Sequence, residues 1–387
     1  MLPRLFRKNG VMMVGYRNIF SVLILCCLVS VGHALPDRFQ FDRSGLLQRL
    51  AAGTFVAGGA GYLVYSSAQP GRLKEAKKEC AVAALSGLAG LSYLWWARRN
   101  CISHDLNIRV FHPPGDQGST RDLTLYLHGW KGRSDCSVGE HYSRPRMPGT
   151  IVSFDFPDAR RGPSLLCDVR TVVQSDFGQE NDALVAIKVL NDAAKAGSPE
   201  RIFLHGRSRG GAAAVNMRTM LTAVARELPE SAGWRVDLDK IGVSVDDCRS
   251  LLRKMERGAC VLEYPSPGVQ KLISYRYGLL SPLVKIGLFV FSKYKPWGLH
   301  PSESRLPLNR QLTLVLFQKN DAWVGNSEHN KQLIERLCAG GNCCCVLEGA
   351  HPDGHNTSGL KQFGAEVAKF LVECSGKSDW RSACSRG

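Results

Sequence analysis

The chain has 387 residues, of which 44% are hydrophobic and 22% charged, with 39 glycines and 14 cysteines. This apolar content excludes a disordered polymer, the length excludes a small disulfide-stapled domain, and glycine shows no collagen period. The formal net charge is +16, and residues 1–100 alone contribute a net +9 from 13 Lys/Arg and four Asp/Glu. Because the basic excess accompanies the longest apolar runs, we expect a membrane surface as partner and no nucleic acid.

The first apolar run, Ile19–Ala34, follows four basic residues and ends in small residues before a proline. A basic segment, an apolar segment and a small residue at Ala34 are typical of a signal peptide. A short signal anchor has the same pattern. We therefore predict that residues 1–34 form one or the other.

Two further apolar stretches, residues 45–65 and 80–97, are each near the ~20 residues that a helix needs to cross a bilayer. Both are rich in glycine and alanine, which allow membrane helices to approach closely, and both end in tyrosine or tryptophan. Two buried helices of a soluble domain are the alternative. The aromatic ends and the basic pair Arg98-Arg99 favour a transmembrane helical hairpin over residues 45–97, and hence a membrane localisation.

From Leu106 onward, short apolar runs alternate with helical patterns. This alternation predicts an α/β fold whose mainly parallel, doubly wound sheet is covered by helices on both faces. The expected strands are Thr124–Leu127, Ile151–Phe154, Ile202–Leu204, Ile241–Val245, Leu312–Phe317 and Cys345–Leu347, and the expected helices are Gly178–Asn191, Gly211–Leu228, Asn326–Cys338 and Gly359–Cys374.

Residues 249–310 do not fit the alternation. They contain the strongly apolar segment Leu279–Phe291, which is flanked by proline and by basic and aromatic residues. We expect a cap or lid inserted into the sheet topology; an irregular core helix is the alternative.

The strongest chemical signal is the sequence Gly206-Arg207-Ser208-Arg209-Gly210, between an apolar strand and an alanine-rich helix. A G-x-S-x-G motif at a sharp strand-to-helix turn projects the serine hydroxyl from the sheet, and its glycines avoid side-chain clashes. The helix that follows favours negative charge at its N-terminus. Ser208 is therefore the candidate nucleophile.

In this context the sequence resembles the α/β-hydrolase superfamily over about Leu106–Cys374. His128-Gly129, after an apolar strand, is similar to the HG motif of that superfamily. The resemblance implies that the backbone N–H groups of Trp130 and Arg209 form the oxyanion hole, and that His128 is structural. Asp155 and Asp182, at the next strand and the next helix start, are expected to be turn and capping residues.

The resemblance also implies an acid after a later strand and then a histidine. Asp321 follows the strand Leu312–Phe317 and fits the acid position; Asp246 or Asp247, one expected strand earlier, is the rival. Two histidines, His351 and His355, follow the last strand. We favour His351 because it directly follows the strand, and we retain His355 as the alternative. The order Ser208, Asp321, histidine is that of the superfamily.

These residues predict a membrane-anchored serine hydrolase that cleaves carboxylic ester, thioester or lipid substrates through an acyl-enzyme, without a cofactor. The alternatives are a catalytically inactive membrane interaction protein of the same fold, or a serine peptidase.

Arg207 and Arg209 would suit an anionic substrate, or they form salt bridges with nearby carboxylates. The cysteines at 338 and 343–345 match no common zinc spacing, so we expect buried thiols or a disulfide and no metal.

Overall fold

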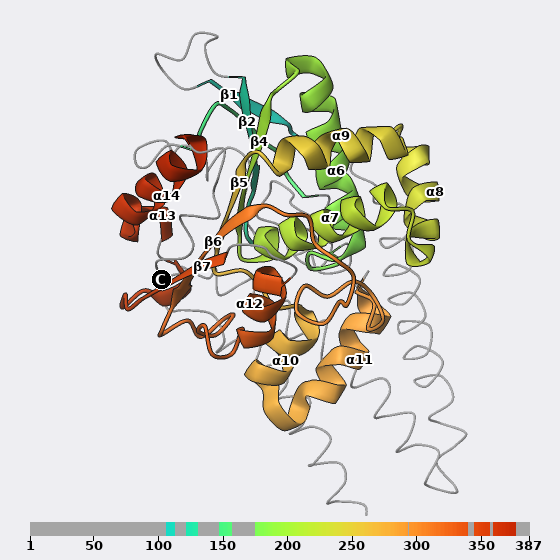
Figure 1. Ribbon diagram of the computed structural model, residues 1–387. Coiled ribbons are helices and arrows are strands. Elements are labelled where there is room, and N and C mark those ends of the chain that lie inside the picture. Colours follow the sequence, from blue (N-terminus) through green and yellow to red (C-terminus); the bar gives the residue numbers. More distant parts are fainter. Residues whose placement is uncertain are drawn as a thin grey trace, which may run out of the picture. The chain divides into compact units, whose positions relative to one another are not determined.

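The computed structural model describes residues 106–112, 121–130, 147–156, 175–292, 294–339, 344–356 and 359–376 (Figure 1). The expected signal segment, residues 1–34, and the expected membrane hairpin, residues 45–97, lie outside these ranges. Within these ranges, none of the helices is both long enough and apolar enough to span a bilayer.

A seven-stranded sheet, in the spatial order β1-β3-β2-β4-β5-β6-β7, forms the centre of the described part of the chain. Only β1 is antiparallel to its neighbour, and the other pairs run parallel. The expected mainly parallel sheet is therefore confirmed. The strands are β1 (Arg109–Phe111), β2 (Asp122–Leu127), β3 (Thr150–Ser153), β4 (Arg201–Arg207), β5 (Ala259–Glu263), β6 (Leu312–Gln318) and β7 (Cys344–Gly349).

Alternate residues of the central strands enter two separate hydrophobic cores. In β4, Ile202 and Leu204 pack on one face of the sheet, and Phe203 packs on the other. The first face is covered by α6 (Glu180–Gly197), α7 (Arg209–Ala225), α9 (Val245–Met255) and α12 (Lys331–Cys338). The second face is covered by α14 (Gly364–Gly376), which follows the short helix α13 (Gly359–Gln362). Figure 1 shows α14 on the opposite side of the strands from α6 and α7.

The expected strand Ile241–Val245 is wrong. The helix α8 (Ala232–Lys240) ends just before it, and Ser244 caps the next helix, α9. The Ser244 side chain accepts a hydrogen bond from the Asp247 N–H, and the Asp247 carboxylate accepts one from the Ser244 N–H. This capping box accounts for the helix start that the apolar pattern concealed. The true strand is β5, which begins at Ala259.

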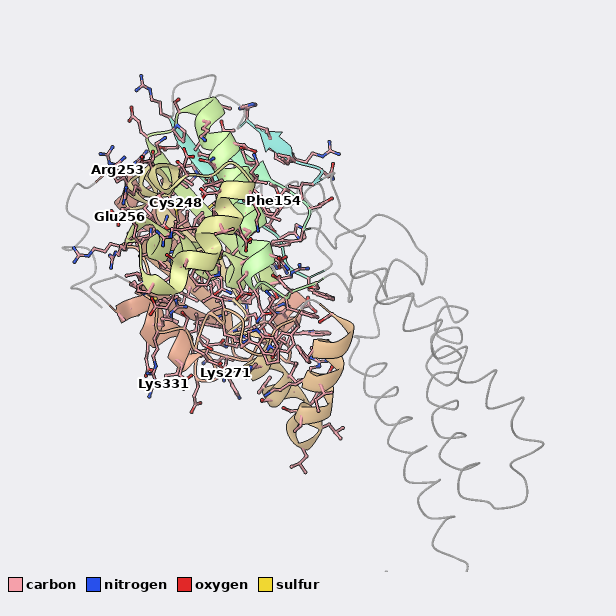
Figure 2. The ribbon with its side chains drawn as sticks, turned by 90° about the vertical axis from the view of Figure 1, so that its right-hand side faces the viewer. Phe154, Cys248, Arg253, Glu256, Lys271 and Lys331 are labelled. Carbon is pink, nitrogen blue, oxygen red and sulfur yellow. The ribbon has the colours of Figure 1, made fainter. Side chains whose placement is uncertain are left out.

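The expected cap over residues 249–310 was too wide, because it included most of α9 and all of β5. The helical part of this stretch is α10 (Val269–Tyr277), a short 3-10 turn η2 (Gly278–Leu280) and α11 (Ser281–Phe291). These elements form a hairpin with its own small core. Figures 1 and 2 both show this hairpin at the opposite end of the described ribbon from α9, on which Figure 2 labels Cys248 and Arg253.

Candidate active site

Ser208 occupies a sharp turn between β4 and α7. Its φ of 51° and ψ of −114° lie in a region that L-residues rarely adopt. Backbone hydrogen bonds hold the turn: the Ser208 N–H donates to the carbonyl of Glu263 at 2.8 Å, and the Ser208 carbonyl accepts from Ser266 at 3.1 Å. The expected strand–turn–helix arrangement around Ser208 is thus present.

The two glycines of the motif are required by close packing of backbone. A Cβ atom at Gly210 would lie 2.0 Å from the carbonyl oxygen of Leu127, at the end of β2. A Cβ atom at Gly206 would lie 2.7 Å from the carbonyl oxygen of Gly210. Side chains at either position would therefore separate the first turn of α7 from the sheet and displace Ser208.

A continuous series of hydrogen bonds connects Ser208, His355 and Asp321. His355 Nε2 lies 3.0 Å from Ser208 Oγ, and His355 Nδ1 lies 2.7 Å from Asp321 Oδ2. Because a carboxylate only accepts, this pattern assigns the imidazole proton to Nδ1 and leaves Nε2 as acceptor of the Ser208 hydroxyl proton. The side chain of His355 is 16% exposed and that of Asp321 is fully buried.

The Asp321 carboxylate is held from its other side as well. Its Oδ1 accepts hydrogen bonds from the backbone N–H groups of Trp323 at 2.7 Å and Val324 at 2.9 Å. Asp321 directly follows the two-residue turn after β6. The carboxylate is therefore oriented toward His355 by the backbone of its own loop.

His351, which we favoured from the sequence, does not lie in this series. Its ring Nδ1 accepts a hydrogen bond from the N–H of Asp353 at 3.2 Å, within the local turn. The carbonyl of His351 accepts from Gly354 at 2.9 Å, which closes the turn and brings His355 forward. A Cβ atom at Gly354, whose φ is 48°, would lie 2.8 Å from the carbonyl oxygen of Asn320. The turn thus packs directly on the loop of Asp321. Because of this long-range contact, His355 and not His351 reaches Ser208.

Three groups from other elements fix the loop that carries His355. Arg207 donates to the carbonyl of His355 at 3.2 Å, and the ring of Tyr264 lies 5.6 Å from the imidazole. The buried carboxylate of Glu263 accepts from the N–H of Gly359 at 2.5 Å. The backbone is therefore anchored at His355 and again at Gly359, and the imidazole itself contacts the Tyr264 ring.

Glu263 is the residue that the sequence reasoning missed. One of its carboxylate oxygens is hydrogen-bonded to the ring of His205, the other holds the loop at Gly359, and its carbonyl accepts from Ser208. It is the last residue of β5, which we had not recognised as a strand. The apolar run Ala259–Leu262 is the signal that could have identified this strand. It would have placed the Glu263 carboxylate beside the turn at Ser208.

The region expected to form the oxyanion hole lies against Ser208. A Cβ atom at Gly129 would be 3.4 Å from the Cβ of Ser208, and Trp130 follows immediately. His128 is buried, with Nε2 accepting from the N–H of Phe156 at 3.3 Å and Nδ1 2.8 Å from the carbonyl of Gly129. His128 therefore holds this loop, in agreement with the structural role that we expected for it.

The guanidinium of Arg209 is buried and forms a bidentate ion pair. Its Nε and Nη2 atoms lie 2.6 and 2.8 Å from the two oxygens of Asp182. The guanidinium also packs over the rings of Phe156 and Trp130, 4.5 and 5.5 Å from their centroids. Of the two roles considered for Arg209, the salt bridge is therefore correct. Asp182 also accepts from the N–H of Gly178, which precedes α6, but the first N–H groups of the helix are bound by Asp176, so the expected capping role of Asp182 is wrong.

A second carboxylate, Asp176, lies near this ion pair. Burial, followed by the charge of Asp182, raises the pKa of Asp176 well above its ordinary value. Its Oδ2 accepts from the N–H groups of Asn181 and Asp182 at the start of α6. Its Oδ1 is buried without a hydrogen-bond partner.

The rival acids Asp246 and Asp247 serve a different purpose. Both are in the first turn of α9, where Asp247 completes the capping box and pairs with Lys195 at 3.0 Å. Asp246 pairs with Arg249 at 3.0 Å. Their position follows from the helix that replaces the expected strand.

Five cysteines are free thiols: Cys248, Cys260, Cys338, Cys344 and Cys345. Cys344 is half-buried on the sheet, whereas Cys338 and Cys345 are exposed. Burial and the neighbouring thiol of Cys338 raise the pKa of Cys344. Within the described ranges, no three histidine, cysteine or acidic side chains are grouped so as to hold a metal ion.

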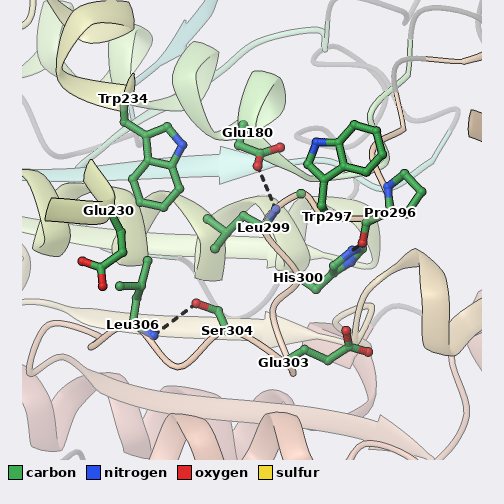
Figure 3. Close-up of a pocket in the computed structure, with 11 residues that line it drawn as sticks. Glu180, Glu230, Trp234, Pro296, Trp297, Leu299, His300, Glu303, Ser304 and Leu306 are labelled. Atoms are coloured by element: carbon green, nitrogen blue, oxygen red, sulfur yellow. Dashed lines mark hydrogen bonds between the residues drawn. The ribbon is translucent and has the colours of Figure 1, made fainter. Parts of the chain in front are cut away.

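A surface pocket of about 390 Å³ lies apart from the Ser208 series, since it includes none of these three residues (Figure 3). Figure 3 shows Trp234 and Trp297 on its two sides, with Glu180 hydrogen-bonded to the N–H of Leu299. Its remaining lining is mixed: Glu230, Pro296, Gly298, His300, Glu303, Ser304 and Leu306.

Solved structures similar to this chain include several hydrolases. A puromycin-hydrolyzing peptidase from Mycobacterium tuberculosis is 15% identical with a TM-score of 0.41, and the match covers 70% of this chain and 37% of that chain. Est1E from Butyrivibrio proteoclasticus, with ferulic acid bound, is 13% identical (TM-score 0.42; 70% and 96% covered). A monoacylglycerol lipase from Paleococcus ferrophilus is 14% identical (TM-score 0.37; 69% and 98%). No protein-family model and no curated protein sequence matches the chain.

Proposed function

We propose that this protein is a serine hydrolase of the α/β-hydrolase superfamily that cleaves carboxylic ester, thioester or lipid substrates. The observation that carries the proposal is the series Ser208–His355–Asp321, with contacts of 3.0 and 2.7 Å, on the turn between β4 and α7. A nucleophile, a base and an acid that orients the base are the three parts of a Ser-His-Asp triad. They occur here in the chain order Ser, Asp, His that is typical of this superfamily.

The proposed reaction begins when His355 Nε2 accepts the proton of the Ser208 hydroxyl as its oxygen attacks the substrate carbonyl. Asp321 keeps the other ring proton on Nδ1 and stabilises the imidazolium that forms. The backbone N–H groups of Trp130 and Arg209 stabilise the tetrahedral oxyanion. His355 then returns the proton to the leaving alcohol or thiol, and a water molecule releases the acyl group from Ser208 by the same steps.

The surroundings of Ser208 favour an apolar acyl group. The positive charge of Arg209 is neutralised by Asp182, so it does not supply a site for an anionic substrate. Beside the turn between β4 and α7, the rings of Trp130 and Phe177 are stacked with their centroids 4.9 Å apart, and they form an apolar wall. This wall supports an ester or lipid substrate with an apolar acyl chain.

A fluorophosphonate probe tests the proposal, because it labels only an activated serine. We expect labelling and ester hydrolysis by the wild-type chain, and loss of both in Ser208→Ala. Ser266→Ala is the matched control, since Ser266 is a buried serine hydrogen-bonded to the same turn. Absence of labelling in the folded wild type would instead favour the catalytically inactive interaction protein, and selective cleavage of peptides would favour the serine peptidase.

We further propose that residues 45–97 hold the protein in a membrane and that residues 1–34 act as signal peptide or signal anchor. The support is the length, glycine content and aromatic ends of the apolar stretches. Extraction of membranes with alkaline carbonate tests the anchor in a chain that begins at Asp37. Retention in the pellet is expected, and release into the supernatant would contradict the proposal.

A further inference from the structure

The hairpin of α10, η2 and α11 has an unusual charge pattern. Residues 264–302 contain five basic residues and neither aspartate nor glutamate, although the whole chain has 34 acidic residues. The basic residues are Lys271, Arg276, Lys285, Lys293 and Lys295. The segment therefore has a local charge of +5 between Glu263 and Glu303, and three of its basic residues, Lys271, Arg276 and Lys285, lie in the hairpin itself.

The helix α11 carries apolar residues on two opposite faces. Val284 and Leu288, four residues apart, pack against the hairpin's small core. Ile286 and Phe289 lie roughly 100–200° away around the helix and are 60% and 38% exposed. Among the α11 side chains that the structure describes, those of Val284 and Leu288 contact this core, whereas those of Ile286 and Phe289 are exposed, as is expected of a helix face that meets lipid.

Other exposed apolar residues lie beside this outer face. Leu279, in the η2 turn at the tip of the hairpin, is fully exposed, and Trp297 is 72% exposed with its ring 5.2 Å from that of Phe289. We refer to Leu279, Ile286, Phe289 and Trp297 as the hairpin surface. In Figure 1 the tip of the hairpin points away from the sheet.

We propose that the hairpin surface docks on an anionic lipid bilayer. Apolar side chains that enter the interface, an aromatic ring at its edge and basic residues near the headgroups are the features that bind peripheral helices to such membranes. Each basic residue near an anionic surface adds to binding, and residues 269–291 contain no acidic residue, although Glu180, Glu230 and Glu303 line the pocket beside Trp297. This charge pattern selects an anionic bilayer over a neutral one.

The hairpin also contacts the loops of the candidate active site. Arg276 in α10 donates to the carbonyl of Ala322 at 3.1 Å, next to Asp321, and its guanidinium lies 4.0 Å from the centroid of the Trp323 ring. On the other side, the hairpin core contacts Phe177, which stacks on Trp130. Docking would hold these loops beside the bilayer, so that the substrate comes from the membrane. The origin of the substrate rests on the proposed function, whereas the docking itself does not.

Hydrogen–deuterium exchange of the full chain tests the docking without requiring catalysis. Nanodiscs that each carry one chain are prepared from phosphatidylcholine alone and from phosphatidylcholine with phosphatidylglycerol. The exchange rates in the two preparations are then compared. Exchange in residues 275–291 is expected to slow several-fold when the anionic lipid is present. Leu279→Ser with Ile286→Ser, or Lys285→Gln with Lys295→Gln, should remove most of this effect. Val110→Ser with Val236→Ser is the control, because these valines are 53% and 54% exposed on other elements.

Equal exchange of the wild type in the two lipid mixtures would overturn the proposal. Protection that is present in both mixtures and unaffected by the substitutions would also overturn it, because another part of the chain would then cover the surface. Hydrolysis of a water-soluble ester is measured in parallel. A wild type that is protected by anionic lipid but hydrolyses no ester would refute the proposed function and leave the docking intact.

Discussion

The carboxylate of Glu263 and the imidazole of His205 form a hydrogen-bonded pair on adjacent strands, and neither side chain is more than 2% exposed. The same carboxylate holds the N–H of Gly359, four residues after His355. The backbone carbonyl of Glu263 holds the N–H of Ser208. One buried residue thus connects the nucleophile turn to the loop of the proposed base.

Glu263→Ala should strongly destabilise the protein, because it leaves His205 and the N–H of Gly359 buried without their acceptor. Removal of one member of a buried pair typically costs about 3–5 kcal/mol. Glu263→Gln retains an acceptor for Gly359 and should lose less. Thermal unfolding of the full chain in mild detergent measures both. Equal unfolding temperatures for wild type and Glu263→Ala would contradict the linking role.

His355→Ala should lower kcat by ~10³-fold or more, as for a disabled triad member. His351→Ala is the matched control, four residues earlier in the same turn, and should retain most of the activity. Both are measured with one soluble ester, together with the unfolding temperature. If His351→Ala were the inactive variant, the hydrogen-bond geometry of His355 would not represent the reacting enzyme.

Gly210→Ala should destabilise the fold by more than the ~1–3 kcal/mol of ordinary overpacking, because the new methyl group meets backbone. The carbonyl oxygen of Leu127 would lie 2.0 Å from the added Cβ. Gly197→Ala is the control: it lies at the end of α6, where an added Cβ has no atom within 4 Å. The control should be neutral or stabilising by up to ~1 kcal/mol. Equal unfolding temperatures for the two variants would refute the packing argument.

Asp176→Asn should stabilise the protein increasingly as the pH rises. The pKa of Asp176 is raised in the folded state by burial and by Asp182, so its contribution to stability is fully present below its ordinary value of 3.8. That contribution is lost as the pH rises through the folded-state pKa, and the asparagine variant has no such loss. Unfolding temperatures at acidic and alkaline pH measure the difference. Asp239→Asn, on the exposed face of α8, is the control.

The sequence by itself determined the mainly parallel sheet, the position of Ser208 on a strand–turn–helix motif and Asp321 as the carboxylate beside it. These features depend on local patterns: alternation of apolar strands with helices, glycines at fixed offsets from a serine, and a polar turn after a buried strand. Each can be recognised within about ten to twenty residues, because strand and helix periodicities are local.

Tertiary structure decided which histidine reaches Ser208, and it assigned Arg209 to a salt bridge. His351 and His355 differ only in where a Pro/Gly turn directs their rings, and that direction is set by packing of Gly354 on Asn320, distant in sequence. Similarly, Glu263 is connected to Gly359 across 96 residues. Contacts of this kind depend on how the chain closes on itself, and no local periodicity records them.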